Sequence, residues 1–319
     1  MHNQASSKVK FEIIHKAIKT DGNLLCVSEM CRLAGVSRSG FYNWKNGFNR
    51  RNEAEIQDKK DFEVILKAYN FRGYAKGARS IYMRLLHKDI RMNIKKIRRL
   101  MKKYQLYCPI RRINPYKKMA RAMQTSHVSS NIVDRNFLSR GARKVLLTDI
   151  TYIFFRTGKC YLSTILDAYT REILAYKLSE SLKVDFVINT VEDLIERHDA
   201  TLDNETIIHS DQGCHYTSNA FIDKLKDENF IQSMSRKGNC WDNAPQESFF
   251  GHMKDEISSK TSQKQCFEDV SRVIDDWIDY YNRDRYQWDL LKLSPNEFYR
   301  YVITGVYPLK PYGSADVKS

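Results

Sequence analysis

The feature that most limits the possible folds is a set of three consecutive apolar, β-branched segments in the second half of the chain. They are KVLLTDITYIFF (144–155), KCYLSTILDAY (159–169) and EILAYKLSE (172–180), separated by short breaks around Gly158 and Arg171. Segments of this length and composition are typical of β-strands that follow one another in a sheet. We therefore expect three adjacent strands here.

The residues that follow alternate between helical and strand patterns. A helical stripe over 184–194 precedes the strand-like ETIIHSD (205–211), and a helix over 219–229, a short strand over 230–234 and a helix over 243–257 come next. This order predicts an α/β fold, a five-stranded sheet with flanking helices. In such sheets the chemistry usually lies at strand ends and helix starts.

Three carboxylates fall at such places. Asp149 lies inside the first apolar strand, Asp211 ends the fourth strand, and Glu247 lies in the first turn of the helix that begins near Asn243. Each has an ordinary alternative: a strand-edge Asp facing water, a turn residue, and an acid that favours a helix start. Together they form a set of hard oxygen ligands suited to Mg²⁺, and three acids can hold two such ions.

The helix that carries Glu247 has its own start signals. Asn243 and Gln246 have the spacing of a capping box, and Pro245 suits a first turn that needs no backbone donor. Lys254 lies seven residues after Glu247, two turns along the same helix face, where it can meet a phosphate. A solvent-exposed lysine without a function is the alternative for Lys254.

The charge of the chain is divided unevenly. Residues 1–130 hold 29 basic and 9 acidic side chains, whereas residues 131–319 hold 24 and 29. Three amphipathic helical stripes lie over 62–104, and residues 72–121 contain 17 Lys and Arg but one acid, Asp89. A basic surface without compensating acids favours a polyanionic partner, so we expect nucleic-acid binding through basic residues of these helices. Those residues are Arg79, Lys95, Lys96, Arg98 and Arg99.

Residues 21–46, DGNLLCVSEMCRLAGVSRSGFYNWKN, indicate two short helices separated by a turn. Ser28 is the expected cap of a helix that buries Met30, Leu33 and Ala34, Gly35 breaks it, and Ser37 is the expected cap of a second helix with Phe41 and Trp44 inward. This pattern predicts a helix-turn-helix whose second helix offers Arg38, Ser39, Asn43 and Lys45 to a DNA groove. An ordinary helical hairpin is the alternative.

Several motifs together resemble a known family. They are HSDQG (209–213), YTS (216–218), GNCWDNAPQESFFGHMKDE (238–256), DYYNRDR (279–285) and LSPNEF (293–298). They look like the second-frame product of bacterial insertion-sequence transposases of the "IS-three" group, relatives of retroviral integrases. Asp211 and Glu247 have 35 residues between them, and Asp149 and Asp211 have 61 between them, as in that group's acid triad. VSEMCRLAGVSRSGFYNW (27–44), RGYAKGARSIYMRL (72–85) and NIKKIRRLM (93–101) resemble its N-terminal modules.

The resemblance implies an RNase H-like core with a mixed sheet, preceded by small all-helical DNA-binding modules. It implies a DNA transposase in which Asp149, Asp211 and Glu247 bind two Mg²⁺ ions, with Mn²⁺ as a substitute, for strand cleavage and 3′-OH strand transfer. Lys254 then contacts DNA from the element's terminal repeats, with Arg236 and Lys237 as further expected contacts to element or target DNA. The implied partners are double-stranded DNA, a second copy of the chain at least, and a first-frame (OrfA) fusion partner. A DNA-binding regulator and an RNase H-like nuclease that cuts without joining are the alternatives.

The expected organisation follows from these segments. It comprises a helix-turn-helix module over 1–50, a basic helical module over 60–121 after a polar spacer at 46–60, a linker over 122–142, the catalytic core over 143–300 and a tail over 301–319.

Seven scattered cysteines favour neither a disulfide framework nor a zinc finger, and His209, Cys214 and His215 are a poor zinc set. No uncharged apolar run is long enough to span a bilayer, so we expect no membrane partner and a cytoplasmic protein, nucleoid-associated when bound to DNA.

Overall fold

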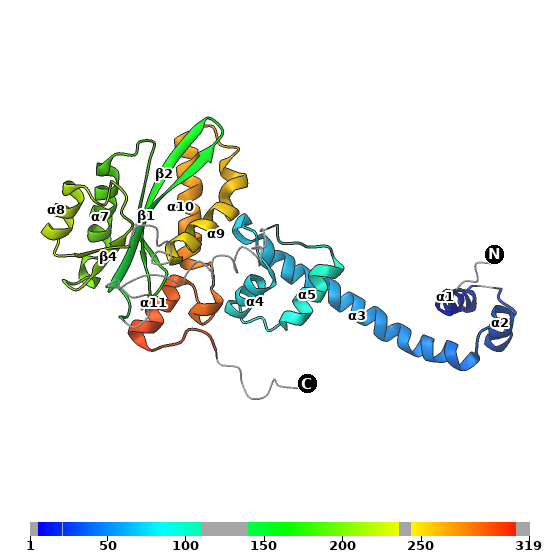
Figure 1. Cartoon of the computed structure of the whole chain (residues 1–319). Coiled ribbons are helices and arrows are strands. Elements are labelled where there is room, and N and C mark those ends of the chain that lie inside the picture. The colour runs from blue at the N-terminus through cyan, green and yellow to red at the C-terminus, as the bar shows by residue number, and fades with distance from the viewer. Residues whose placement is uncertain (1–5, 21, 110–139, 236–243, 311–319) are drawn as a thin grey trace, which may run out of the picture. The chain divides into compact units, whose positions relative to one another are not determined.

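A computed structural model describes residues 6–20, 22–109, 140–235 and 244–310 (Figure 1). The contacts divide the chain into two compact units, residues 1–67 and residues 68–319. Within the described ranges, no helix is both long and apolar enough to cross a membrane.

The first unit contains the expected first short helix and turn, but the expected second short helix is the start of a 33-residue helix. Its helices are α1 (Ser7–Ile18), α2 (Val27–Ala34) and the start of α3 (Arg38–Asn70), and Gly35 ends α2 with a left-handed backbone (φ 62°). Ser37 accepts a hydrogen bond from the Gly40 N–H (3.0 Å), so it caps α3 as predicted. The predicted cap at Ser28 is wrong, because α2 begins after Cys26, whose N–H donates to Glu29.

The core of this unit contains Ile14, Met30, Cys31 and Phe41, with Trp44 packed against it. The prediction that Leu33 is buried is wrong: its side chain is 71% exposed. The expected polar spacer at 46–60 is also absent, because α3 continues through it. That segment is rich in Arg, Glu, Gln and Lys, which are strong helix formers, so its polarity does not interrupt the helix.

The second unit contains the predicted mixed five-stranded sheet. Its strands are β1 (Val145–Phe155), β2 (Gly158–Asp167), β3 (Ile173–Ser179), β4 (Ile207–Ser210) and β5 (Ile231–Met234), in the order β3-β2-β1-β4-β5. The first three strands pair antiparallel, whereas β4 pairs parallel with β1 and with β5. The α/β fold class expected from the sequence is therefore confirmed.

Helices cover both faces of this sheet. On one face α7 (Val184–His198) and α8 (Asn219–Asp227) form a core with Leu146 and Ile165. The short helical turn η2 (Asp199–Thr201) directly follows α7. On the other face α9 (Ala244–Thr261) and α10 (Phe267–Arg283) pack against Leu147 and Ile153. Five aromatic residues of α9 and α10 are buried there: Phe249, Phe250, Trp277, Tyr280 and Tyr281.

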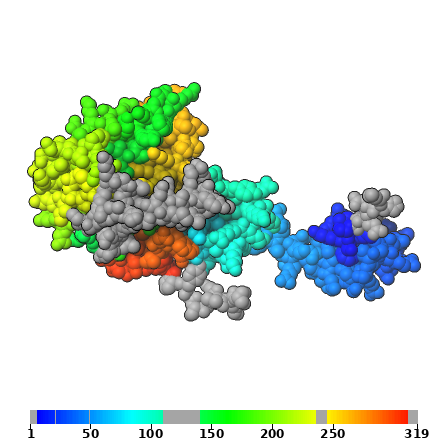
Figure 2. All heavy atoms as spheres, viewed as in Figure 1, coloured from blue at the N-terminus to red at the C-terminus, as the bar shows by residue number. Residues whose placement is uncertain are grey.

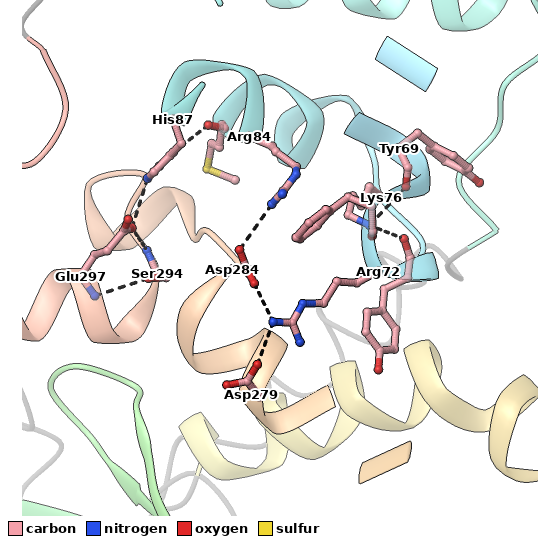
Figure 3. A network of polar contacts seen from close by, with 12 residues as sticks. Tyr69, Arg72, Lys76, Arg84, His87, Asp279, Asp284, Ser294 and Glu297 are labelled. Carbon is pink, nitrogen blue, oxygen red and sulfur yellow. Dashed lines mark hydrogen bonds and ion pairs between the residues drawn. The ribbon is translucent and has the colours of Figure 1, made fainter. Parts of the chain in front are cut away.

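The basic segment that precedes the sheet packs against the C-terminal helices of the same unit. It contains η1 (Phe71–Gly73), α4 (Ala78–His87) and α5 (Ile94–Lys103), and its partners include η4 (Trp288–Leu290) and α11 (Pro295–Thr304). The Tyr74 ring stacks on Tyr280 with centroids 4.7 Å apart. His87 stacks on Tyr286 and contacts the Glu297 carboxylate at 3.1 Å (Figure 3).

Ion pairs reinforce this packing. The Arg72 guanidinium lies 2.7 Å from Asp279 and 3.2 Å from Asp284 (Figure 3). It also lies 3.2 Å from Asp276. Arg84 pairs with the same Asp284 at 3.6 Å, and its side chain is only 8% exposed. A buried guanidinium needs a compensating charge, so Asp284 holds two elements of the fold together.

Replacing Asp284 by Ala should therefore destabilise the protein. The variant leaves buried Arg84 without its acidic partner and weakens the Arg72 network, so we expect a loss of about 2 kcal/mol in the free energy of unfolding. Asp289→Ala is the matched control, because Asp289 is 73% exposed and only approaches Arg171 at 3.6 Å. Urea unfolding measures both changes, and equal losses in the two variants would show that Asp284 has no special structural role.

Candidate active site

Asp149 lies on β1 at the point where the strand loses one neighbour. Parallel pairing with β4 covers only Val145 to Leu147, so Asp149 is two residues beyond the last pair, Leu147 with His209. Its carboxylate is half-buried, and one oxygen accepts a hydrogen bond from the Ile150 N–H (2.7 Å). The cost of placing this carboxylate in an apolar strand is therefore only partly offset by hydrogen bonding.

Asp211 is placed by the same register. It follows β4 and is also two residues beyond the Leu147–His209 pair, so the two aspartates lie at the same edge of the sheet. Its side chain is exposed and accepts a hydrogen bond from the Gly213 N–H (2.9 Å). A Cβ at position 213 would lie 2.9 Å from this carboxylate oxygen and would force the Asp211 side chain to move. Glycine at this position therefore allows the observed orientation of the Asp211 carboxylate.

Glu247 reaches the site from the first turn of α9, where its side chain is exposed. The preceding residue, Gln246, is fully buried and donates a hydrogen bond to the Thr164 hydroxyl of β2. Thr164 is the cross-strand partner of Asp149, so this bond fixes the start of α9 beside Asp149. The capping box predicted for Asn243 and Gln246 stays a prediction, because Asn243 lies outside the described residues.

The three carboxylates interact electrostatically. Burial raises the pKa of Asp149 to about 7, and the negative charges of Asp211 and Glu247 add to this increase. The Ile150 N–H and Lys254 act in the opposite direction. Carboxylates from β1, from the end of β4 and from α9 thus share one region in which negative charge is unfavourable.

These residues fit a hard divalent cation by their chemistry. All three are oxygen donors, and a cation would relieve the repulsion that raises the pKa of Asp149. In the described part of the chain, the present side-chain positions bring no three Asp, Glu, His or Cys groups close enough to hold a metal ion. A zinc set is disfavoured, since His209 is fully buried and contacts the Ser233 hydroxyl at 3.0 Å.

Lys254 lies beside the carboxylates, on α9. Its half-buried ammonium is 4.5 Å from the centroid of the Tyr152 ring. Burial lowers the pKa of Lys254, whereas the charge of Asp149 raises it, which shows that the two groups are close. The sequence analysis did not identify Tyr152 as a neighbour of Lys254. Tyr152 lies inside an apolar segment, and nothing in that segment indicates which of its residues are exposed.

The other predicted DNA contacts fall on separate surfaces. Arg38, Ser39, Asn43 and Lys45 are exposed in the first turns of α3. Arg79 on α4 and Lys95, Arg98 and Arg99 on α5 are exposed, whereas Lys96 is half-buried. Arg236 and Lys237 lie outside the described residues.

The expectation that the basic segment is uncompensated is wrong for three of its residues. Arg72 and Arg84 pair with Asp276, Asp279 and Asp284 of the C-terminal helical region. Lys76 is buried, and its ammonium donates hydrogen bonds to backbone carbonyls, among them that of Tyr74 at 2.7 Å. Burial lowers the pKa of Lys76 to about 8. Part of the local positive charge is therefore structural.

Family models match three parts of the chain. Residues 140–240 and 230–293 each match a model described as "Integrase core domain". Residues 55–113 match one described as "HTH-like domain".

Several curated proteins are similar over most of their length. A "transposase-like protein" of Haemophilus influenzae is 33% identical over 66% of this chain and 94% of its own. The insertion element IS600 31 kDa protein of Shigella sonnei is 31% identical over 84% of this chain and 97% of its own length. The putative transposase InsK for insertion sequence element IS150 of Escherichia coli K12 is 29% identical over 85% of this chain and 93% of its own length.

Solved structures give weaker similarities. The catalytic core domain of BIV integrase is 15% identical, with a TM-score of 0.40 over 50% of this chain and 94% of that one. The catalytic domain of Mos1 mariner transposase is 16% identical, with a TM-score of 0.37 over 51% and 76%.

Removing the charge of Asp149 should stabilise the metal-free protein in a pH-dependent way. The pKa of Asp149 rises from 3.8 to about 7, so between these values the folded protein holds a proton that the unfolded chain has lost. The contribution of this group to stability therefore falls as pH rises. In EDTA, we expect Asp149→Asn to raise the Tm by about 5 °C at pH 8 and to change it little at pH 4.

Asp227→Asn, an exposed change on α8, serves as the control and should show no such pH-dependent difference. Scanning calorimetry of the three proteins makes the comparison. An Asp149→Asn variant no more stable than wild type at pH 8 would contradict the raised pKa.

Proposed function

The chain belongs to the family of insertion-sequence DNA transposases with an integrase core domain, and on this premise we propose that its reaction takes place at Asp149, Asp211 and Glu247. The observation that carries this proposal is the strand register that places Asp149 and Asp211 at one edge of the sheet, where the charge of Glu247 from α9 also acts on Asp149. Acids that repel one another at an open sheet edge are suited to a site completed by cations and phosphate.

The residues have distinct roles in this proposal. Asp149, Asp211 and Glu247 hold two Mg²⁺ ions, or Mn²⁺ in their place, which when bound supply positive charge to the attacking and leaving oxygens. The Gly213 N–H donates a hydrogen bond that orients the Asp211 carboxylate. The hydrogen bond from Gln246 to Thr164 holds the start of α9, and with it Glu247, at the site. Lys254 contacts a DNA phosphate next to these carboxylates.

The substrate is double-stranded DNA at the terminal repeats of the element. Water first attacks a phosphodiester and breaks its bond to the 3′-oxygen, which leaves as a 3′-OH. This 3′-OH then attacks another phosphodiester and displaces the 3′-oxygen of the strand that it joins. Both steps are displacements at phosphorus, so one set of carboxylates serves both. The exposed basic residues of α3, α4 and α5, together with Arg236 and Lys237, hold the DNA.

Strand transfer also defines the partners. Two element ends react together, so we propose a homodimer or a larger assembly of this chain. A first-frame (OrfA) partner joined by frameshifting would add to end recognition. The place of action is the cytoplasm, at the nucleoid when the protein is bound to DNA.

Neutralising any one of the three acids should abolish the chemistry and leave DNA binding intact. For Asp149→Asn, Asp211→Asn and Glu247→Gln we expect cleavage and joining to fall by at least about 10³-fold, because each removes charge that stabilises the transition state. Labelled DNA ends incubated with Mg²⁺ report both products on a gel, and EDTA should remove both.

Asp227→Asn is again the control and should retain both activities. A Glu247→Gln variant that joins strands as well as wild type would show that the assigned site is wrong. A wild type that cuts without joining would favour an RNase H-like nuclease. Binding without any reaction, even with a first-frame partner present, would favour a DNA-binding regulator.

DNA binding should weaken steeply with salt. Each phosphate contact by Lys or Arg contributes about −0.9 to the slope of log K against log salt concentration. We expect Lys95→Ala and Arg98→Ala each to reduce this slope by about 1 unit in fluorescence anisotropy. Lys226→Ala, an exposed change on α8, should leave it unchanged. A slope that none of these changes alters would place the DNA on another surface.

A further inference from the structure

Two large aromatic side chains are exposed close to the carboxylates. Tyr152 is 52% exposed and Phe154 is 63% exposed, both on β1. Their rings form an edge-to-face pair with centroids 5.2 Å apart. A pair of aromatic rings held together on an open strand is a feature that marks binding surfaces.

The neighbouring strand extends this surface. In the β1–β2 register, Tyr161 is opposite Tyr152 and Lys159 is opposite Phe154, so all four side chains lie on one face of the hairpin. The Lys159 ammonium is exposed and lies 5.6 Å from the centroid of the Tyr161 ring. We call this set of four residues the hairpin face.

The hairpin is held in place at its tip. The Arg156 N–H donates to the Lys264 carbonyl (3.0 Å), and the Thr157 hydroxyl donates to the Gln265 carbonyl (2.7 Å). Both acceptors belong to the segment that follows α9. Figure 2 shows the hairpin, in green, beside the yellow and orange surface of α9 and α10. The aromatic rings are therefore presented by a supported strand pair.

The hairpin face adjoins the candidate active site. Tyr152 is three residues after Asp149 on the same strand, and Lys254 connects the two positions. Its ammonium lies 4.5 Å from the Tyr152 ring and interacts with the charge of Asp149. Strand alternation places Tyr152 and Asp149 on opposite faces of β1, so Lys254, at the edge that β4 leaves free, is the group that a ligand on Tyr152 shares with the carboxylates.

The composition of the surface defines its ligand. The exposed rings of Tyr152 and Phe154 and the half-buried ring of Tyr161 lie close to the ammonium groups of Lys159 or Lys254, and none of the four residues of the hairpin face is acidic. Aromatic faces stack on nucleic-acid bases, and the interspersed cations contact the phosphates between them. In duplex DNA the bases are already stacked on one another, so this surface fits unpaired nucleotides.

We propose that the hairpin face binds unpaired nucleotides next to the scissile phosphate by stacking their bases on Tyr152 and Phe154. This inference rests on the proposed function, which brings the DNA end to Asp149. It adds a requirement for local strand separation at that end and a platform that captures the separated strand.

The test compares two DNA ligands and three full-length proteins. The ligands are a blunt duplex and the same duplex with a short single-stranded extension that contains 2-aminopurine, whose fluorescence is quenched by stacking. The proteins are wild type, the double variant Tyr152→Ala/Phe154→Ala, and the control Tyr152→Phe/Phe154→Tyr, which keeps both rings. All measurements are made in EDTA, so no cleavage is needed for a readout.

We expect wild type and the control to quench 2-aminopurine and to bind the extended DNA equally well. The alanine variant should bind it about 10-fold to 100-fold more weakly and lose the quenching, with less than about a two-fold change for blunt DNA. Both replaced side chains are exposed, so its Tm should match that of wild type. If the Tm of the alanine variant is lower, Lys159→Ala is tested in its place. This variant should weaken binding of the extended DNA without affecting the core.

Undiminished quenching by the alanine variant would overturn the proposal, as would an equal loss of affinity for both DNA ligands. A change in oligomeric state by sedimentation equilibrium, with DNA binding unaltered, would instead assign the hairpin face to contacts between copies of the chain. Quenching by a wild type that neither cuts nor joins DNA would leave this inference standing and reject the proposed function.

Discussion

The candidate site depends on a short parallel pairing between β1 and β4. Three residue pairs, from Val145–Ile207 to Leu147–His209, bring the ends of two strands together and place Asp149 and Asp211 at one edge. Because the pairing stops there, β1 continues with one side free of β4, and Lys254 of α9 can approach both Asp149 and Tyr152. Gln246 then joins α9 to β2 through Thr164, so all three acids are positioned by the sheet.

The positive charge of the chain has two uses. In the segment that contains α4 and α5, Arg72, Lys76 and Arg84 turn inward and hold the segment against the C-terminal helices. Basic residues on the outer surface, such as Lys95 and Arg98, face solvent. Net charge therefore overstates the number of groups that can contact DNA, because the acids that neutralise the inward residues lie far away in the sequence.

Local patterns were sufficient to predict the sheet and the first short helix and turn of the first unit. Each of these features is set by periodicity within a short window. Leu33 was misassigned because one apolar residue on a short helix can face either way. The role of Gln246 and the partners of Arg72 depend on residues about 80 and 200 positions away, which no local pattern reveals. The acid triad remains a prediction supported by electrostatic proximity.

The pairing of Arg72 with Asp276 also has a consequence for synthesis of the chain on the ribosome. The two residues are 204 positions apart, so at ordinary rates of translation the arginine emerges about 10 to 40 s before its acidic partner. During this interval the nascent chain displays Arg72 and Arg84 without the acids that later neutralise them. We therefore expect the growing polypeptide to bind polyanions more strongly than the finished protein until Asp284, the residue after α10, has emerged.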